Sequence, residues 1–295
     1  MTTTITILNA LSAQASPLVG QALNKNYKVR AFARKTEKLN NRFGENPNLT
    51  KGHADLNDLN SLITAFDGAD GAFVHLPIPQ SPEQPGLWLQ NIIAATRQSK
   101  LPHLVFSTSG PTGSRYASTP MIDGTSAAKS AIEAANLPVT ILMPTIYLEN
   151  MQVPPFVPQL HSDGILTYPP LPADMKIAFT SHVDQARYAL AAFEKPNLIG
   201  ETIEIASKPM LNGAELAQIF STALGQPVKF EPLTPEQFGT QIGELFQSPE
   251  VGQGLTGLYQ SISALGKNGM AIDVAALEEK FGIELPSIAD QIANW

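Results

Sequence analysis

The stretch "TITILNALSAQASPLVGQALNKNYKVRAFARK" at residues 4–35 decides the fold. It begins with a short apolar segment, passes through a turn into a segment with helical spacing, and ends in a second apolar segment. A strand, a tight turn, a helix and a second strand in this order are typical of the βαβ unit that binds dinucleotides. Such a turn usually carries three glycines, but the turn "NALSAQAS" carries none. The stretch therefore predicts a βαβ unit and leaves open whether its turn binds a nucleotide or is an ordinary strand–helix connection.

The rest of the first half repeats this alternation. We expect strands at residues 4–9, 28–33, 49–56, 71–77, 103–109 and 139–145, and helices at 17–25, 59–66, 88–100 and 124–136. Strands separated by helical segments favour parallel pairing with right-handed crossovers. The pattern predicts an α/β fold, a doubly wound parallel sheet of the Rossmann type with helices on both faces.

After residue 150 the pattern loosens. The segment 153–172 is rich in proline and cannot form one long regular element. Further along we expect a helix at 181–194 capped by Ser181, a strand at 201–206, a helix at 213–225 ending at a glycine, an extended piece at 228–234 and mostly helix from 235 to 295. We therefore expect a Rossmann domain at 1–150, to which the chain returns near 181–206, and a smaller, mostly helical substrate domain at 151–295.

Composition excludes several classes of function. The chain has 295 residues, a net charge of −7 and no block of Lys or Arg, so we expect no nucleic-acid partner. The absence of Cys excludes disulfides and thiolate metal sites, and the five histidines lack metal-ligand spacing, so we expect no metal. The segment "MTTTITIL" does not have the form of a signal peptide, and no apolar run is long enough to cross a membrane. We therefore expect a soluble cytoplasmic protein with no membrane contact.

The residues at the three glycine positions are those closest to glycine in backbone tolerance or in side-chain size. Alignment on the strand places Asn9, Ser12 and Ala15 at these positions. Asn tolerates a left-handed backbone conformation, and Ser and Ala have the smallest side chains after Gly. The following helix still offers free N–H groups and the positive end of its dipole to a phosphate.

The ends of the second and third strands carry residues suited to an adenosine. Arg34 and Lys35 follow the second strand, where an Arg suits the 2′-phosphate of NADP. Asp55 and Leu56 follow the third strand, where they would flank an adenine. The alternatives are two solvated basic residues and a helix N-cap region, in which Asp58 fits the cap better than Asp55 does.

Six segments lie in the order found in one known family. They are "VRAFARKTEKL" (29–39), "HADLNDLNSLITAFDGADGAFVHLP" (53–77), "FSTSG" (106–110), "AAKSAIEAANLPVTILMPTIYLENM" (127–151), "SHVDQARYALAAFEKPNLIGETIEIAS" (181–207) and "DVAALEEKFGIELPSIADQIANW" (273–295). Over essentially its whole length the chain resembles the NmrA-like family of atypical short-chain dehydrogenase/reductases. The resemblance implies a Rossmann domain, NADP(H) binding and a small substrate domain. Some members reduce quinones or other small molecules, and others are redox sensors that bind a regulatory partner.

The chain departs from the Tyr-x-x-x-Lys motif of ordinary short-chain reductases. Lys129 matches the motif's Lys, which holds the nicotinamide ribose, but Thr125 stands in place of the proton-donating Tyr. Many NmrA-like proteins also lack this Tyr. Tyr116, Tyr147 and Tyr168 are alternative donors by position, although no spacing favours one of them.

Hydroxyl side chains follow the fifth strand. Ser107, Thr108 and Ser109 lie where a hydroxyl can hold a substrate carbonyl, or they form a polar strand end before the turn "SGPTG". His75 follows the fourth strand, where it faces the cofactor or is a hydrogen-bonded structural residue. Met143 stands in "ILMP" where the family often has Arg, so this part of the site has changed.

These residues define the predicted site. We expect Lys129, Ser109 and Thr108 to be catalytic. We expect the cofactor to contact Asn9, Leu11, Ser12, Ala13, Gln14, Arg34, Lys35, Asp55, Leu56, His75, Leu76, Pro77, Ser107, Lys129, Pro144 and Tyr147.

Three functions remain open at this point. The first is an NADP(H)-dependent oxidoreductase acting on a small carbonyl or quinone-like molecule. The second is a non-catalytic NADP(H) sensor with a protein partner. The third is a pocket that has lost the cofactor and catalyses an isomerisation or cyclisation, since Cβ atoms at positions 12 and 15 narrow the space for a pyrophosphate. We expect NADP(H) to bind, more weakly than to a glycine-rich relative, and the third function corresponds to its loss. The protein is expected to be a monomer or homodimer.

Overall fold

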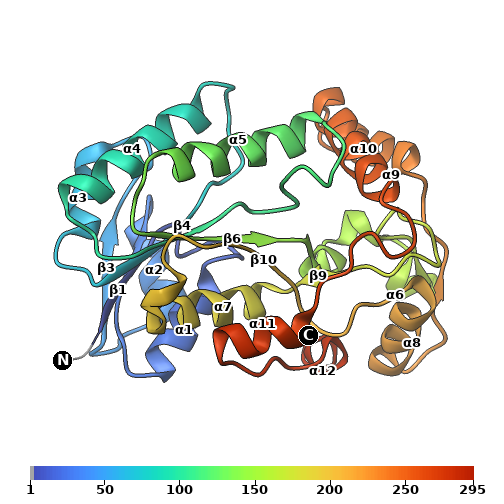
Figure 1. Cartoon of the computed structure of the whole chain (residues 1–295). Coiled ribbons are helices and arrows are strands. Elements are labelled where there is room, and N and C mark those ends of the chain that lie inside the picture. The colour runs from blue at the N-terminus through green and yellow to red at the C-terminus, as the bar shows by residue number, and fades with distance from the viewer. Residues whose placement is uncertain (1–2) are drawn as a thin grey trace.

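The computed structural model describes residues 3–295 and contains a seven-stranded, wholly parallel sheet (Figure 1). Met1 and Thr2, which open the segment considered for a signal peptide, lie outside the described residues. The strands are β1 (Thr4–Ile7), β2 (Lys28–Ala33), β3 (Leu49–His53), β4 (Gly71–His75), β5 (Leu104–Ser107), β6 (Val139–Pro144) and β10 (Thr202–Ile205). Their spatial order is β10-β6-β5-β4-β1-β2-β3, which confirms the doubly wound Rossmann fold. The order reverses between β1 and β4, so a crevice is expected beyond the carboxyl ends of these two strands.

Helices cover both faces of the sheet. In Figure 1, α3 (Leu59–Phe66), α4 (Gln84–Gln98) and α5 (Pro120–Ala134) lie on one face, and α1 (Ser16–Asn24) and α7 (His182–Glu194) lie on the other. Ser181 caps α7 and Asp58 caps α3, as expected, each by accepting backbone N–H groups of the first helical turn.

Two sequence expectations need correction. The strands predicted to end at residues 9, 56 and 77 end at Ile7, His53 and His75, because the residues that follow belong to the turns of the carboxyl edge. Helix α2 (Thr36–Phe43) was not predicted, because Leu39 is its one fully buried residue and its apolar periodicity is therefore weak.

The chain after β6 is built from short elements and then from helices. The proline-rich segment forms η1 (Leu148–Gln152), η2 (Pro154–Phe156), α6 (Leu160–Asp163) and β8 (Ile165–Leu166), as its composition predicts. Two-stranded parallel pairs join β7 (Ile146–Tyr147) to β9 (Phe179–Thr180) and β8 to β11 (Lys229–Phe230). The remaining elements are η3 (Pro196–Leu198), α8 (Gly213–Leu224), α9 (Pro235–Leu245), α10 (Pro249–Ser263), α11 (Val274–Phe281) and α12 (Ile288–Ala293).

Helices α9 and α10 pack closely together beside the first turns of α5 (Figure 1). Glycine permits this approach, because a Cβ atom on Gly252 would lie 2.6 Å from the carbonyl oxygen of Gly239. The expected glycine cap after α8 is also present, since Gly225 adopts a left-handed conformation with φ of 64°.

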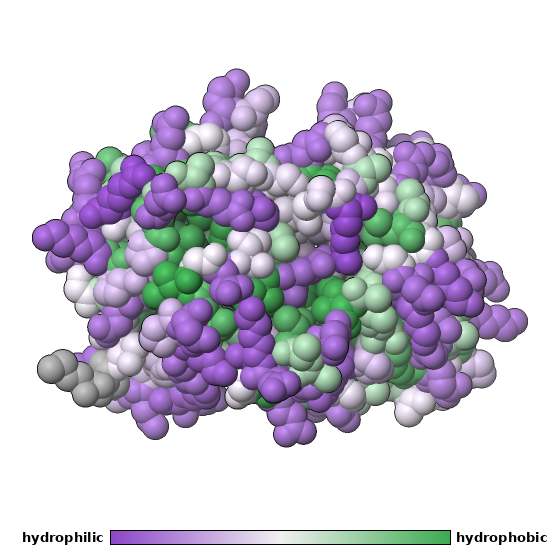
Figure 2. All heavy atoms as spheres, in the orientation of Figure 1, coloured by the Kyte–Doolittle hydropathy of each residue, from purple (hydrophilic) through white to green (hydrophobic). Residues whose placement is uncertain are grey.

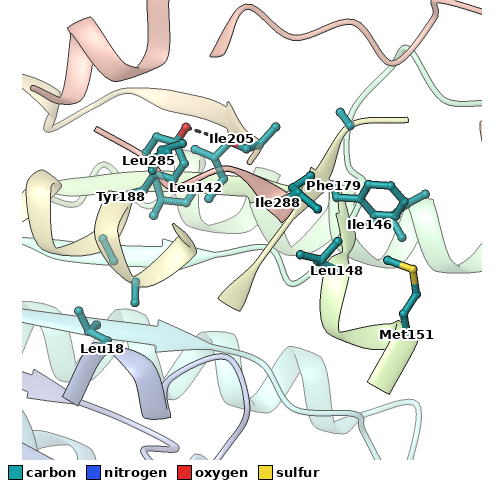
Figure 3. Packing of buried hydrophobic residues seen from close by; sticks show 14 of the residues in the cluster. Leu18, Leu142, Ile146, Leu148, Met151, Phe179, Tyr188, Ile205, Leu285 and Ile288 are labelled. Carbon is teal, nitrogen blue, oxygen red and sulfur yellow. Dashed lines mark hydrogen bonds between the residues drawn. The ribbon is translucent and has the colours of Figure 1, made fainter. Parts of the chain in front are cut away.

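One continuous apolar core joins the sheet to the C-terminal segments. Figure 3 shows Leu18 of α1, Leu142 of β6, Ile205 of β10 and the C-terminal residues Leu285 and Ile288 in the same cluster of buried side chains. Strand β10 pairs in parallel with β6, so the chain after α7 contributes the last strand of the sheet. The division into domains at residue 150 stays a prediction.

The outer surface is mainly hydrophilic. Figure 2 shows hydrophilic residues over the outer helices and hydrophobic ones mainly in the band between the upper helices and the sheet. Among the described residues, no helix combines the length and the apolar character that crossing a membrane requires.

A buried hydrogen bond of Tyr188 connects α7 to the residue that follows β10, and its contribution to stability can be tested. The Tyr188 hydroxyl donates to the Ala206 carbonyl oxygen at 2.9 Å, with the tyrosine fully buried (Figure 3). We expect Tyr188→Phe to lower the free energy of unfolding by about 1–3 kcal/mol, because it leaves that carbonyl unpaired in the core. Urea unfolding measures the change. Tyr27→Phe is the control, since the Tyr27 hydroxyl donates to Glu194 at the surface and its loss should cost less. Equal losses in the two variants would contradict this account.

Candidate functional site

The turn after β1 keeps the backbone shape of a glycine turn with asparagine in place of glycine. Asn9 has φ of 51°, in the left-handed region that few other residues tolerate. Its side-chain amide donates to the His75 carbonyl oxygen at 3.1 Å, which ties the turn to the end of β4. Asn9 therefore supplies the bend and also spans the point at which the strand order reverses.

Ser12 forms a second connection across the same point. Its hydroxyl lies 2.8 Å from Nε2 of His75 and accepts the Ala15 N–H at 3.2 Å. Nδ1 of His75 lies 3.2 Å from the Leu76 carbonyl oxygen, which accepts the imidazole N–H and so leaves Nε2 as an acceptor for the Ser12 hydroxyl. Burial lowers the pKa of His75 from 6.5 to about 4, so the ring is neutral at pH 7, as this arrangement requires.

Three backbone donors of the turn are free for a ligand. Within residues 3–295, the N–H groups of Leu11, Ala13 and Gln14 have no hydrogen-bond acceptor. They immediately precede α1, whose N-terminal end carries a partial positive charge. Free N–H groups at a helix N-terminus are the donor set that binds phosphate. Ala15 is fully buried beneath them, so the smallest of the three replacements lies where helix and strand pack.

A small pocket lies beside this turn, over β2, β3 and β4. Arg34 is exposed at its rim and forms no ion pair within the described part of the chain. The residues that line the pocket are Asn9, Arg34, Asp55, Leu56, Asn57, Pro77, Ile78, Gln80, Gln84 and Trp88. Five of these were predicted from the sequence, whereas Lys35 does not line the pocket but precedes α2. The pocket has a free cation, a carboxylate and an indole, which suit a purine nucleotide.

Two polar residues of this pocket, Asn57 and Trp88, were not predicted from the sequence. Asp55 accepts both the backbone and the side-chain N–H groups of Asn57, at 2.9 and 2.8 Å. The Asn57 side chain also accepts the indole N–H of Trp88 at 2.9 Å. Asn57 directly follows the predicted Asp55-Leu56 pair, but Trp88 lies 31 residues further on, and local pattern does not connect them.

A second polar cluster lies on the other side of the turn, over the ends of β5 and β6. The side-chain oxygen of Gln14 accepts the hydroxyls of Ser109 at 3.2 Å and Tyr147 at 2.9 Å. The Tyr147 hydroxyl also lies 2.8 Å from the side-chain oxygen of Gln185 of α7, so Gln14 and Gln185 share its single proton as acceptors. Ser107 donates to the same Gln185 oxygen at 3.1 Å. We call these five residues the edge cluster. Gln185 was not predicted because it lies at the start of α7, far along the sequence from the strands whose ends it contacts.

The other candidate proton donors lie elsewhere. The Tyr116 hydroxyl contacts Arg115 and Glu204, and the Tyr168 hydroxyl contacts Tyr259 at 2.6 Å. Burial raises the pKa of Tyr147 well above 10, so its hydroxyl stays protonated over the physiological pH range. Tyr147 is thus the tyrosine that the structure brings to the predicted catalytic serine.

Other predicted residues have their side-chain or strand partners outside the edge cluster. Lys129 forms an ion pair with Glu133 one turn along α5, at 2.8 Å. The Thr108 hydroxyl donates to the Gly110 carbonyl oxygen at 3.1 Å and is buried. Pro144 ends β6 beside Ile205 and precedes Tyr147 by three residues. The roles assigned to these residues remain predictions.

A buried acid–imidazole pair borders the edge cluster. The His182 ring lies 4.5 Å from the Tyr147 ring, centroid to centroid, and its Nδ1 lies 3.4 Å from a Glu149 carboxylate oxygen. Burial raises the pKa of Glu149 to about 7 and lowers that of His182 to about 4. At pH 7 the imidazole of His182 is therefore neutral, and the carboxyl of Glu149 is about half ionised. In the described part of the chain, no group of acidic and histidine residues is arranged to hold a metal ion.

The fold defines a Rossmann protein, with a small pocket and a polar cluster at the carboxyl edge of its sheet. The model of the NmrA-like family matches residues 1–285, and the chain belongs to that family.

Similar proteins include enzymes and a regulator. The chain is 25% identical over 183 residues to an NAD(P)H azoreductase of Xenophilus azovorans, with 62% of this chain and 61% of that protein aligned. It is similar in fold to an NADPH-dependent quinone oxidoreductase of Escherichia coli solved with NADPH (TM-score 0.77, 17% identity, 98% of this chain and 99% of that one). It is also similar to NmrA, described as a negative transcriptional regulator (TM-score 0.72, 19% identity, 99% of this chain and 95% of that one).

His75 makes stability depend on pH. Because its pKa is lower in the folded state, only the unfolded state binds a proton between pH 6.5 and about 4, and stability falls as the pH falls through that range. We expect His75→Gln to remove this contribution, so the variant gains about 3 kcal/mol relative to wild type between pH 7 and pH 4. Urea unfolding across this range measures the difference. His161→Gln, at an exposed histidine, is the control. A constant difference between His75→Gln and wild type would contradict the prediction.

Proposed function

We propose that this protein binds NADP(H) at the carboxyl edge of the sheet and transfers a hydride to a small carbonyl or quinone-like substrate. The observation that carries the proposal is that, within residues 3–295, Arg34 at the pocket forms no ion pair and three N–H groups of the turn before α1 have no acceptor. A guanidinium suits a 2′-phosphate, and helix N–H groups suit a pyrophosphate. These two donor sets lie on either side of Asn9, which lines the pocket and opens the turn.

The site residues divide between binding and chemistry. Arg34, Asp55 and Trp88 would hold the adenosine end, and the turn before α1 would hold the pyrophosphate. Bound NADPH would supply the hydride. The Ser109 hydroxyl would hold the substrate carbonyl, and the protonated Tyr147 hydroxyl would provide a proton from Oη through the edge cluster. The azoreductase and the quinone oxidoreductase are named for reductions with NAD(P)H and NADPH, which supports this reaction type.

A redox-sensing regulator is the second candidate. Thr125 occupies the position of the usual acid, and its hydroxyl donates to backbone carbonyls of Pro111 and Ile122. Lys129 is paired with Glu133, so the motif that handles the proton and the ribose in ordinary reductases is internally satisfied. Measuring NADPH oxidation in the presence of a quinone distinguishes an enzyme, which oxidises NADPH, from a sensor, which only binds it. If no nucleotide binds, the third candidate is favoured, in which the pocket catalyses a non-redox reaction.

Arg34 should decide between the two nicotinamide cofactors. We expect Arg34→Ala to weaken NADPH binding by about 10- to 100-fold, because charge-assisted hydrogen bonds contribute about 1.5–3 kcal/mol. The dissociation constant for NADH should change little, because NADH lacks the 2′-phosphate. Isothermal titration calorimetry measures both constants. Lys38→Ala removes a nearby exposed charge and should leave both unchanged. Equal effects of Arg34→Ala on NADPH and NADH would refute this role of Arg34.

Ser109 should affect turnover more than binding. We expect Ser109→Ala to lower the rate of NADPH-dependent quinone reduction by about 100-fold, since a positioned hydroxyl in acid–base catalysis contributes about 10²–10⁴-fold. The NADPH dissociation constant should change by less than threefold. Steady-state kinetics measure the rate, and Ser99→Ala, whose hydroxyl bonds within α4, is the control. A Ser109→Ala enzyme with full activity would exclude the serine from the reaction.

A further inference from the structure

The Gln14 side chain extends from the turn after β1 to the residues at the ends of β5 and β6. Its side-chain oxygen accepts two hydroxyl protons, from Ser109 at 3.2 Å and from Tyr147 at 2.9 Å. Its backbone carbonyl accepts the side-chain N–H of Gln185 at 3.3 Å. A residue that precedes α1 is thus connected to the ends of β5 and β6 and to α7.

These contacts close one half of the crevice and leave the other half open. In a doubly wound sheet, β1 to β3 and β4 to β6 each form one mononucleotide-binding half. The pocket beside Arg34 belongs to the first half, and none of the edge cluster lines it. The edge cluster belongs to the second half, where the hydroxyls that a ligand would use already donate to Gln14.

The Gln14 side chain offers the same kind of hydrogen-bond acceptor as the ligand group that would replace it. Its primary amide offers a carbonyl oxygen to two hydroxyl donors, as a carboxamide or a substrate carbonyl would. A ligand carbonyl that enters this half competes with the Gln14 oxygen for the Ser109 and Tyr147 protons. The other acceptors near these two hydroxyls are the Leu76 carbonyl oxygen at 3.4 Å and the Gln185 oxygen at 2.8 Å. A ligand confined to the adenosine half does not compete for these protons.

We propose that Gln14 is a latch that determines specificity, closing the carbonyl-binding half of the site until its side chain swings out. The latch rests on the proposed function, since it regulates the second half of the same NADP(H) site. It distinguishes a complete dinucleotide, which must open it, from a nucleotide that fills the adenosine half alone.

Two ligands and one truncation test the latch. Adenosine 2′,5′-bisphosphate reports on the adenosine half, and NADPH reports on both halves. We expect Gln14→Ala to bind NADPH about tenfold more tightly than wild type, equivalent to about 1.4 kcal/mol. Binding of adenosine 2′,5′-bisphosphate should stay within twofold, which also shows that the variant is folded. Gln21→Ala removes a glutamine of α1 that bonds Val183, outside the edge cluster, and should leave both constants unchanged.

The outcomes separate the latch from the proposed function. NADPH affinity that is unchanged or weaker in Gln14→Ala, with bisphosphate binding intact, would overturn the latch alone. A parallel rise in affinity for both ligands would also overturn it, because the effect would then not be confined to the second half. If neither ligand binds either protein at millimolar concentration, the proposed function fails and the latch fails with it.

Discussion

The hydrogen bond between Ser12 and His75 joins the turn after β1 to the end of β4 at the one place where the strand order reverses. A Rossmann crevice exists because the chain crosses to opposite faces on either side of this point, and a bound dinucleotide ordinarily spans it. Here protein side chains span it. Asn9 bonds the His75 carbonyl, Ser12 bonds the His75 ring, and Gln14 bonds Ser109.

This constraint explains how a turn without glycine keeps its shape. Glycine would supply a positive φ and room for a phosphate, at the cost of conformational entropy on folding. Asn9 supplies the positive φ. Among residues 3–295, the backbone N–H groups of Leu11, Ala13 and Gln14 beside the two small residues have no acceptor. The neutral His75 holds the arrangement because its low pKa keeps Nε2 available as an acceptor. The shape is therefore maintained by side-chain hydrogen bonds, each of net value about 0.5–1.5 kcal/mol.

The fold could be predicted from the sequence because its evidence is local. Alternating apolar segments give the parallel sheet, Ser181 and Asp58 mark helix starts, and the left-handed Asn9 follows from the tolerance of asparagine. Helix α2 was not predicted because Leu39 is its one fully buried residue, which gives only a weak apolar periodicity. The edge cluster could be predicted only in part. Ser109, Tyr147 and Gln14 were each candidates, but their contacts join residues 95 and 133 positions apart, and no local pattern encodes which hydroxyl meets which acceptor.

The same contacts indicate where chemistry can occur on this scaffold. On α5, Thr125 donates to backbone carbonyls and Lys129 pairs with Glu133, so both groups are satisfied within or next to their own helix. At the edge, the Ser109 and Tyr147 hydroxyls both lie within hydrogen-bond distance of the Gln14 side-chain oxygen. Ser109 also faces the Leu76 carbonyl oxygen at 3.4 Å, and Tyr147 the Gln185 oxygen at 2.8 Å. Gln14 belongs to a turn, so its side chain can rotate without disturbing a strand or a helix, and the two hydroxyls can then be transferred to a ligand. These contacts support the proposal that the reaction takes place at the ends of β5 and β6, with Gln14 controlling access to them.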